Sequence, residues 1–345
     1  MRPVGIGRIL PFRGRGNIMW AMAGFFLRRL VFGLAATFAA LSLSFYYFAS
    51  KFFPLRGTST AHAYWVWLRG LLTGRSFSHG LIYPHLLPMV GAAFGRTMLL
   101  LALTLVIVIV IAVPVGCISA ATRGSALDVG LRIGTYVGWA VPVFVVAIVL
   151  QEGFGRVPLG WGLGWFPEVG WAGSCPGGEG IDIHTARCPA AGHGLTHVGQ
   201  VIYHLTLPAL ALALGFVAVN ARYLRNALLD TLDAPYITVA RGKGLTERAV
   251  LQRHALRNAF VTFVPSLVSG FGLIFGAALV VDYIFRLGGV GTLFLTLLPY
   301  NVDGIVQVDT YALMLLLLIG AAFMFATSVL SEAVVALLDP RMRSD

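Results

Sequence analysis

The stretch LLLALTLVIVIVIAV, residues 99–113, contains no charged or strongly polar side chain, and it decides the fold class. A helix needs about 20 predominantly apolar residues to cross the hydrocarbon core of a bilayer. The apolar run around this stretch extends over residues 98–120, so we expect a transmembrane helix there. The rest of the chain agrees, because 58% of its 345 residues are hydrophobic and only 11% are charged. Since a soluble domain carries about 25% charged residues, a water-soluble enzyme, a disordered chain and a disulfide scaffold are excluded.

Five further apolar segments give six predicted spans and an all-α, polytopic membrane protein. They cover residues 30–48, 133–150, 201–219, 260–284 and 311–338. Aromatic residues rather than a small-residue cleavage site follow the first span, which indicates a retained anchor and not a signal peptide. Prolines and glycines within the spans indicate kinks and close helix packing or, alternatively, the hinges of a pathway that opens and closes. These residues are Pro114, Pro142, Pro208, Pro265, Gly270, Gly272 and Gly276.

The net charge is confined to one face of this arrangement. The chain has 25 Lys and Arg and 14 Asp and Glu, a formal net charge of +11. Seventeen of these bases and six of the acids fall in alternate segments on the N-terminal side, namely 1–29, 121–132, 220–258 and 339–345. The whole excess therefore lies on that face. Since basic loops remain inside, both termini are expected in the cytoplasm, and the excess need not indicate nucleic acid.

The predicted outer loop 153–200 contains Cys175 and Cys188. Because the outside of a cell is oxidising, we expect a disulfide between them, which would contribute roughly 3 kcal/mol by loop entropy. Two alternatives stay open. The thiols could be free, or they could join a metal site, although the spacing matches no tetrahedral zinc pattern and no metal is expected. The candidate metal ligands beside them are His184, His193 and His197.

The inner loop 220–258 is the most basic segment and has the clearest local pattern. Its second half, with the first residues beyond it, reads YITVARGKGLTERAVLQRHALRNAF over residues 236–260. Gly242 and Gly244 are expected to break two helical halves, because glycine has no Cβ to clash at positive φ. Thr246 has the character of an N-cap, with Glu247 and Arg248 in the first turn after it. The apolar positions on one face of the second half are Val250, Leu251 and Leu256. Such a helix could lie on anionic lipid or dock in a groove of a partner, and the residues alone leave both open.

The same segment resembles the cytoplasmic loop of permease subunits of binding-protein-dependent ABC importers, especially the dipeptide, oligopeptide and nickel group. YITVARGKGL at 236–245 is similar to that group's YVRTARAKGL, and HALRNA at 254–259 reads as its HALRNA. The broader motif of Glu-Ala-Ala, three residues, Gly, nine residues and Ile-x-Leu-Pro is met at Ala240, Gly244 and Leu256. The segment departs from this motif, as the peptide group's own variant does, at Thr238, Val239, His254 and Arg257.

Other phrases of that group occur in the same order along residues 25–343. They are FLRRL at 26–30, GRSF at 74–77, PVF at 142–144, LPAL at 207–210, DYIF at 282–285 and LDPR at 338–341. The phrases FLRRL and GRSF indicate the B-type subunit, which is the first of the group's two permease subunits. Residues 1–24 and part of 153–200 are not covered by the resemblance.

The resemblance implies a type I ABC importer permease fold with six helices in the bacterial cytoplasmic membrane. Its parts would be a basic extension 1–24, a first helix and outer segment 25–95, a permease core 96–338 and a cytoplasmic tail 339–345. The implied partners are a second permease subunit, two ABC ATPase subunits that bind ATP and Mg, and an extracytoplasmic substrate-binding protein. The chain itself would be non-catalytic and hold no cofactor. The cargo would be a dipeptide or oligopeptide, with nickel chelates or another small solute as alternatives.

The resemblance also implies a coupling helix that seats in a groove of one ATPase. Its residues would be Ala240, Arg241, Gly242, Lys243, Gly244, Leu245, Thr246, Glu247 and Arg248.

A channel or secondary transporter is the first competing interpretation, and it would require charges inside the membrane. Only Asp282 and Glu332 are candidates, and both lie near span ends, so we expect interfacial or helix-capping acids. A membrane-embedded enzyme is the second, and the sequence contains no HExxH, GxSxG or Walker A motif to support it. Neither the cargo nor the residues that line the pathway can be read from the sequence.

Overall fold

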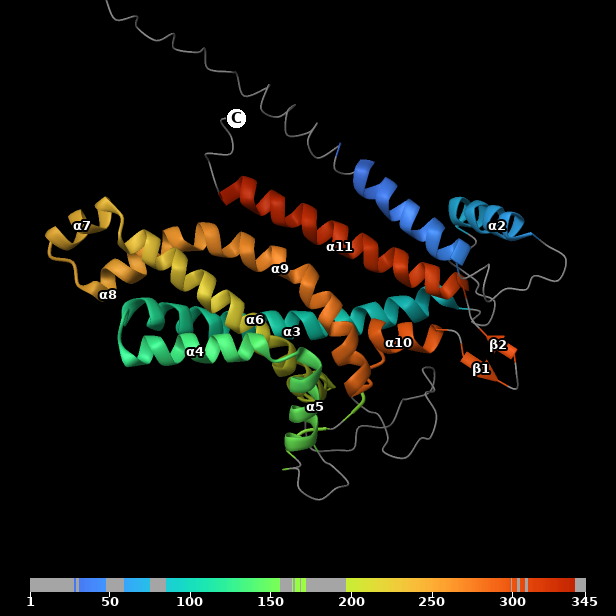
Figure 1. Cartoon of the computed structure of the whole chain (residues 1–345), viewed down its shortest axis with the longest axis horizontal. Coiled ribbons are helices and arrows are strands. Elements are labelled where there is room, and N and C mark those ends of the chain that lie inside the picture. The colour runs from blue at the N-terminus through green and yellow to red at the C-terminus, as the bar shows by residue number, and fades with distance from the viewer. Residues whose placement is uncertain are drawn as a thin grey trace, which may run out of the picture.

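Long helices make up most of the protein in a computed structural model, which describes residues 28, 31–47, 59–74, 85–155, 163, 165–167, 169–171, 197–298, 300–302, 305–307 and 310–338. Figure 1 shows the long helices running roughly along one axis, with helices α7 and α8 at one end and helix α10 with a small hairpin at the other. We call these the α7 end and the α10 end.

Four helical segments are long and apolar enough to cross a membrane. They are α3 (Leu86–Ala121), α6 (His197–Leu232), α11 (Thr310–Leu338) and the continuous segment Glu247–Phe285, which contains α9 (Leu256–Phe285). They confirm the helices predicted at 98–120, 201–219, 260–284 and 311–338, and α3 and α6 extend well beyond the predicted bounds. Helix α6 packs against α3 and α9, and α9 packs against α11. Small residues permit this approach, since a Cβ at Gly270 would lie 2.9 Å from the ring of Phe216.

The prediction of a single unbroken helix at 133–150 is wrong. Two helices, α4 (Ala126–Ala140) and α5 (Val143–Phe154), replace it and meet at 97°. The break falls at Pro142, which lacks an N–H, and the preceding Val141 is extended with ψ of 123°, as a residue before proline prefers. Pro114, Pro208 and Pro265, by contrast, are accommodated inside continuous helices.

The described helices thus provide four spans, or five when the bent pair counts as one. A further apolar helix, Val31–Tyr47, has 17 residues and coincides with the first predicted span. It packs against α2 (Thr60–Thr73), where the rings of Phe45 and Trp67 stack at 4.9 Å. The six-helix count and the side on which the termini lie stay predictions.

Short elements complete the described chain. They are α7 (Pro235–Gly242), α8 (Glu247–Ala249), the π-helix η2 (Val250–Ala255), α10 (Val290–Leu297), β1 (Tyr300–Val302) and β2 (Ile305–Gln307). The two strands pair antiparallel, so among the described residues the all-α expectation holds apart from this hairpin and an isolated bridge between Gly155 and Phe166. Cys175 and Cys188, the candidate metal ligands His184 and His193, and the side chain of His197 lie outside the described residues, as do residues 1–24 and 339–345.

Candidate functional site

The chain reverses direction twice beyond α6 and forms a helix–turn–helix at the α7 end. Pro235 occupies the start of α7, where its missing N–H has no intrahelical partner to lose. Gly244 follows the end of α7 with φ of 78°, and its N–H donates to the carbonyl of Arg241 at 2.9 Å. A left-handed glycine directly after the C-cap residue, here Lys243, is a common way for a helix to end. The prediction that Gly242 also breaks the helix is wrong, because Gly242 is the last helical residue of α7.

The second helix begins where the sequence predicts. The Oγ1 of Thr246 accepts the N–H of Ala249 at 3.3 Å, which confirms Thr246 as the N-cap. Across the turn, the guanidinium of Arg241 donates from Nε and Nη2 to the carboxylate of Glu247 at 2.8 and 3.2 Å. This hydrogen-bonded pair raises the pKa of Arg241. Because both side chains are exposed, the pair fixes the geometry of the turn more than it stabilises the fold.

A small apolar core holds the two halves together. Ile237 of α7 and Val250 of η2 are fully buried, and Ala240 and Leu232 pack with them. The Nδ2 of Asn258 donates to the hydroxyl of Tyr236 at 2.6 Å. After the short α8, the second half continues as the π-helix η2, a form often found at functional sites. The helix–turn–helix is therefore tied to both α6 and α9.

The predicted coupling residues lie together along the outside of this turn. Ala240 faces the small core, and every residue from Arg241 to Arg248 is exposed. Three apolar side chains share the outer surface with the basic ones: Tyr236, Val239 and Leu245 are 45%, 59% and 37% exposed. The element thus presents an exposed surface with both apolar and basic side chains.

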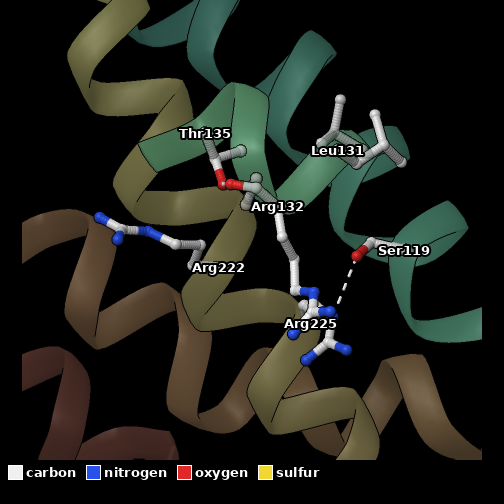
Figure 2. Close-up of a pocket in the computed structure, with 8 residues that line it drawn as sticks. Ser119, Leu131, Arg132, Thr135, Arg222 and Arg225 are labelled. Carbon is white, nitrogen blue, oxygen red and sulfur yellow. Dashed lines mark hydrogen bonds between the residues drawn. The ribbon is translucent and has the colours of Figure 1, made fainter. Parts of the chain in front are cut away.

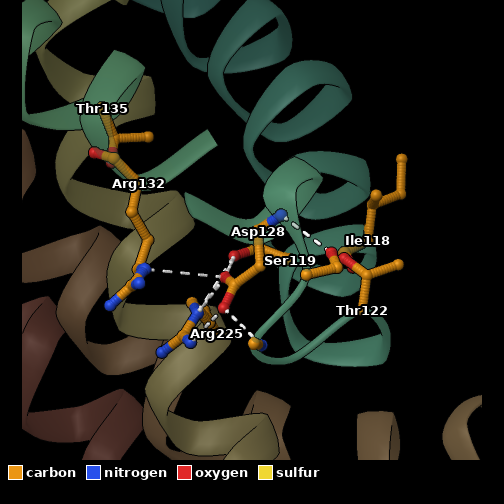
Figure 3. A network of polar contacts seen from close by, with 9 residues as sticks. Ile118, Ser119, Thr122, Asp128, Arg132, Thr135 and Arg225 are labelled. Carbon is orange, nitrogen blue, oxygen red and sulfur yellow. Dashed lines mark hydrogen bonds and ion pairs between the residues drawn. The ribbon is translucent and has the colours of Figure 1, made fainter. Parts of the chain in front are cut away.

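A buried polar cluster near this element could not be identified from the sequence. It lies where α3, α4 and α6 meet (Figure 3). Asp128 of α4 is 1% exposed and accepts Nε and Nη2 of Arg225 at 3.0 and 2.9 Å. Ser119 donates to the same carboxylate at 2.6 Å, and the N–H of Gly124 donates at 3.1 Å. The sequence signal is local only, because Ser125 with Asp128 three residues later has the spacing of a helix capping box. Nothing in the spacing points to Arg225, 97 residues away.

Two further contacts surround the cluster. Arg123, in the turn between α3 and α4, pairs with Asp233 just before α7 at 3.2 Å, and both are exposed. Arg222 points away from Arg225 (Figure 2) and stacks over the rings of Tyr136 and Trp139 at 4.7 and 5.6 Å. A small pocket lies between α3, α4 and α6 beside the cluster. Its lining residues are Val115, Ser119, Leu131, Arg132, Thr135, Ala221, Arg222 and Arg225.

At the α10 end, Asp282 caps a helix. Its carboxylate accepts the N–H groups of Gly289 and Thr292 at 2.9 and 2.7 Å, at the start of α10. Thr97 of α3 accepts the next N–H, that of Val290, at 2.9 Å. This confirms the interpretation of Asp282 as a helix-capping acid. Glu332, the other acid considered, is half-buried in α11.

A protein-family model described as "Binding-protein-dependent transport system inner membrane component" matches residues 112–344, which include the whole helix–turn–helix. The chain belongs to this family. Among its relatives, the oligopeptide transport system permease protein AppB of Bacillus subtilis is 30% identical over 74% of this chain and 71% of that protein. The oligopeptide transport system permease protein OppB of Mycobacterium tuberculosis is 31% identical over 74% of this chain and 72% of that protein.

A solved structure shares the fold. The inward-facing MetNI methionine ABC transporter aligns with a TM-score of 0.53 and 15% sequence identity, over 73% of this chain and 96% of that one. These findings confirm the family resemblance drawn from residues 236–260. The protein is a permease subunit of a binding-protein-dependent transporter, and the interpretations as channel, secondary transporter or membrane enzyme are set aside.

Proposed function

We propose that this permease is the B-type subunit of a bacterial peptide importer. The names of the relatives AppB and OppB support a peptide cargo. In this proposal the chain pairs with a second permease subunit in the cytoplasmic membrane, and an extracytoplasmic binding protein delivers the peptide. Two ABC ATPase subunits bind ATP and Mg and hydrolyse the ATP. Nickel chelates or another small solute are the alternative cargoes. Uptake of labelled dialanine in the presence of each unlabelled candidate distinguishes them, because the true cargo competes for uptake.

The proposed topology has six helices with both termini in the cytoplasm. The helix Val31–Tyr47 is the first span, and the bent pair α4 and α5 is the third. The excess of Lys and Arg in segments 1–29, 121–132, 220–258 and 339–345 supports this orientation, because basic segments are retained inside. The α7 end is then cytoplasmic.

The helix–turn–helix is the proposed docking point of one ATPase. A helix that lies on lipid separates an apolar face from a basic one. Here exposed Val239 and Leu245 lie beside exposed Arg241 and Lys243, which suits a groove with both apolar and acidic groups. This mixed exposed surface, on an element tied to both α6 and α9, is the observation that carries the proposal. When ATP binding moves the groove, the element passes the displacement to those helices.

Replacement of Gly244 by valine tests this role. A β-branched residue at a φ of 78° is strained by about 1–2 kcal/mol or more. Among the described residues no atom lies within 4 Å of the added Cβ, so the change acts mainly through the backbone. Because 1.4 kcal/mol is a factor of ten, we expect uptake of labelled dialanine and tetraalanine to fall about 5- to 30-fold. The amount of the subunit in the membrane, measured by immunoblot, should not change.

Gly91→Ala is the matched control, at the α10 end. Gly91 is helical and exposed, and no atom of the described residues lies within 4 Å of a Cβ there, so alanine fits and uptake should stay within about twofold of wild type. Unchanged uptake in Gly244→Val would refute the assignment of this turn as the coupling element.

A further inference from the structure

The turn between α3 and α4 is fastened to α6 at two levels. The inner fastening is the cluster of Asp128, Arg225 and Ser119, where one carboxylate accepts three side-chain hydrogen bonds between 2.6 and 3.0 Å (Figure 3). The outer fastening is the exposed pair of Arg123 and Asp233. Asp233 lies directly between the end of α6 and the start of α7. Any displacement of α7 therefore begins at a residue that already contacts the α3–α4 turn.

The inner fastening resists sliding of α4 along α6. Asp128 is 1% exposed and the side chain of Arg225 is 14% exposed, so neither charge can exchange its partner for water without a large cost. Two parallel hydrogen bonds between guanidinium and carboxylate also fix the relative orientation of the two helices. Arg132 contributes less, because its Nε lies 3.8 Å from the carboxylate and its side chain is 44% exposed.

A route also leads from α4 to the α10 end. Helix α5 continues α4 after the break at Pro142, and it packs against α6 and α9. At its far end, Gln151 donates from Nε2 to the carbonyl of Ile284 at 3.3 Å, close to the turn between α9 and α10. Displacement of α4 at one end of the molecule can thus reach the other end through packed helices.

We propose that Asp128, Arg225 and Ser119 are positioning residues of a joint that makes α3 and α4 move with α6 when the ATPase displaces α7. The inference rests on the proposed function, and it deepens it by naming side chains that couple ATP hydrolysis to opening of the pathway. None of the three contacts cargo or nucleotide in this account. Their effect is on how much transport each hydrolysed ATP produces.

The test uses the assembled importer, with its second permease, ATPases and binding protein, in proteoliposomes. The readout is ATP hydrolysed per labelled dialanine or tetraalanine imported. For Arg225→Gln and Asp128→Asn we expect this ratio to rise at least about fivefold, the lower range of coupling between linked sites. Arg222→Gln is the matched control, because it removes the same charge from the same helix but takes away ring stacking on α4 and, among the described residues, no ion pair. Its ratio should stay within about twofold of wild type.

A double variant separates coupling from folding. Asp128→Asn with Arg225→Gln leaves no unpaired buried charge, so the complex should assemble and melt near the wild-type temperature. We expect its ratio to remain at least about fivefold above wild type, because the charged bonds are still missing.

Three outcomes overturn the joint. They are a double variant that assembles and keeps the wild-type ratio, a ratio raised as much by Arg222→Gln as by Arg225→Gln, and loss of every joint variant from the membrane, which would mean a folding role only. A wild-type complex that neither hydrolyses ATP nor imports either peptide would instead overturn the proposed function, and the joint with it.

Discussion

The two turns at the ends of the segment Glu247–Phe285 both contain a glycine in the left-handed region, yet they are built in opposite ways. Gly244 at the α7 end has φ of 78°, and Gly288 at the α10 end has φ of 69°. In the described part of the chain no atom lies within 4 Å of a Cβ built on Gly244, whereas a Cβ on Gly288 would overlap the guanidinium of Arg96. The α7 turn is shaped by its backbone and left open, and the α10 turn is shaped by what surrounds it.

The carboxylates near the two turns differ in the same way. Glu247 is 71% exposed and pairs with an exposed arginine, while Asp282 is 1% exposed and accepts backbone N–H groups of α10. The α7 turn can bind a partner because its outer face is exposed. The α10 turn keeps one conformation because side chains of several helices pack around it. The difference indicates that the α7 end presents a surface and the α10 end holds the helices in register.

The largest expected effect is at Gly291, in the first turn of α10. A Cβ there would overlap the backbone carbonyl of Leu279, which cannot move aside as a side chain could. Overpacking costs typically 1–3 kcal/mol, and here we expect about 3 kcal/mol or more for Gly291→Ala. The midpoint of thermal unfolding in detergent should fall clearly. Gly276→Ala is the control, because a Cβ at Gly276 meets no atom of the described residues within 4 Å and should leave the midpoint unchanged. Equal midpoints for the two variants would show that the α10 turn is not closely packed, and the contrast with the α7 turn would be lost.

The effect expected for Gly244→Val is smaller than that for Gly291→Ala. The smallest effect is expected at the ion pair of the α7 turn. Arg241 is 42% exposed and Glu247 is 71% exposed, and exposed pairs contribute about 0–1 kcal/mol. We therefore expect Arg241→Gln to change the free energy of unfolding by less than about 1 kcal/mol. Thermal unfolding of the purified subunit measures this. A larger loss would show that the α7 turn depends on this pair and is less independent than its backbone suggests.

Some of these features could be predicted from the sequence because they depend on neighbours along the chain. Long apolar runs located the four long helices, Thr246 was identifiable as an N-cap, and Gly244 as the turn glycine. The role of Gly242 could not be predicted, because a glycine near a helix end is compatible with either conformation, and the left-handed Gly244 completes the turn without it.

Other features depend on distant partners and could not be predicted. Pro142 lies at the 97° bend between α4 and α5 while Pro208 lies inside the continuous helix α6, and local sequence does not separate the two cases. The pairing of Asp128 with Arg225 requires α4 and α6 to be placed in space first. For the same reason the sequence could suggest a coupling turn and could not show what fastens it to the other helices.

Site-directed photo-crosslinking to the ATPase tests the central claim most directly. A photoreactive residue is placed at Val239, which is 59% exposed on α7, or at Leu273, which is 75% exposed on α9 away from both ends. In membranes that contain the assembled importer, we expect Val239 to crosslink to an ATPase subunit and Leu273 to give no such product. Absence of an ATPase crosslink from Val239 in an assembled importer that hydrolyses ATP and transports would contradict the account.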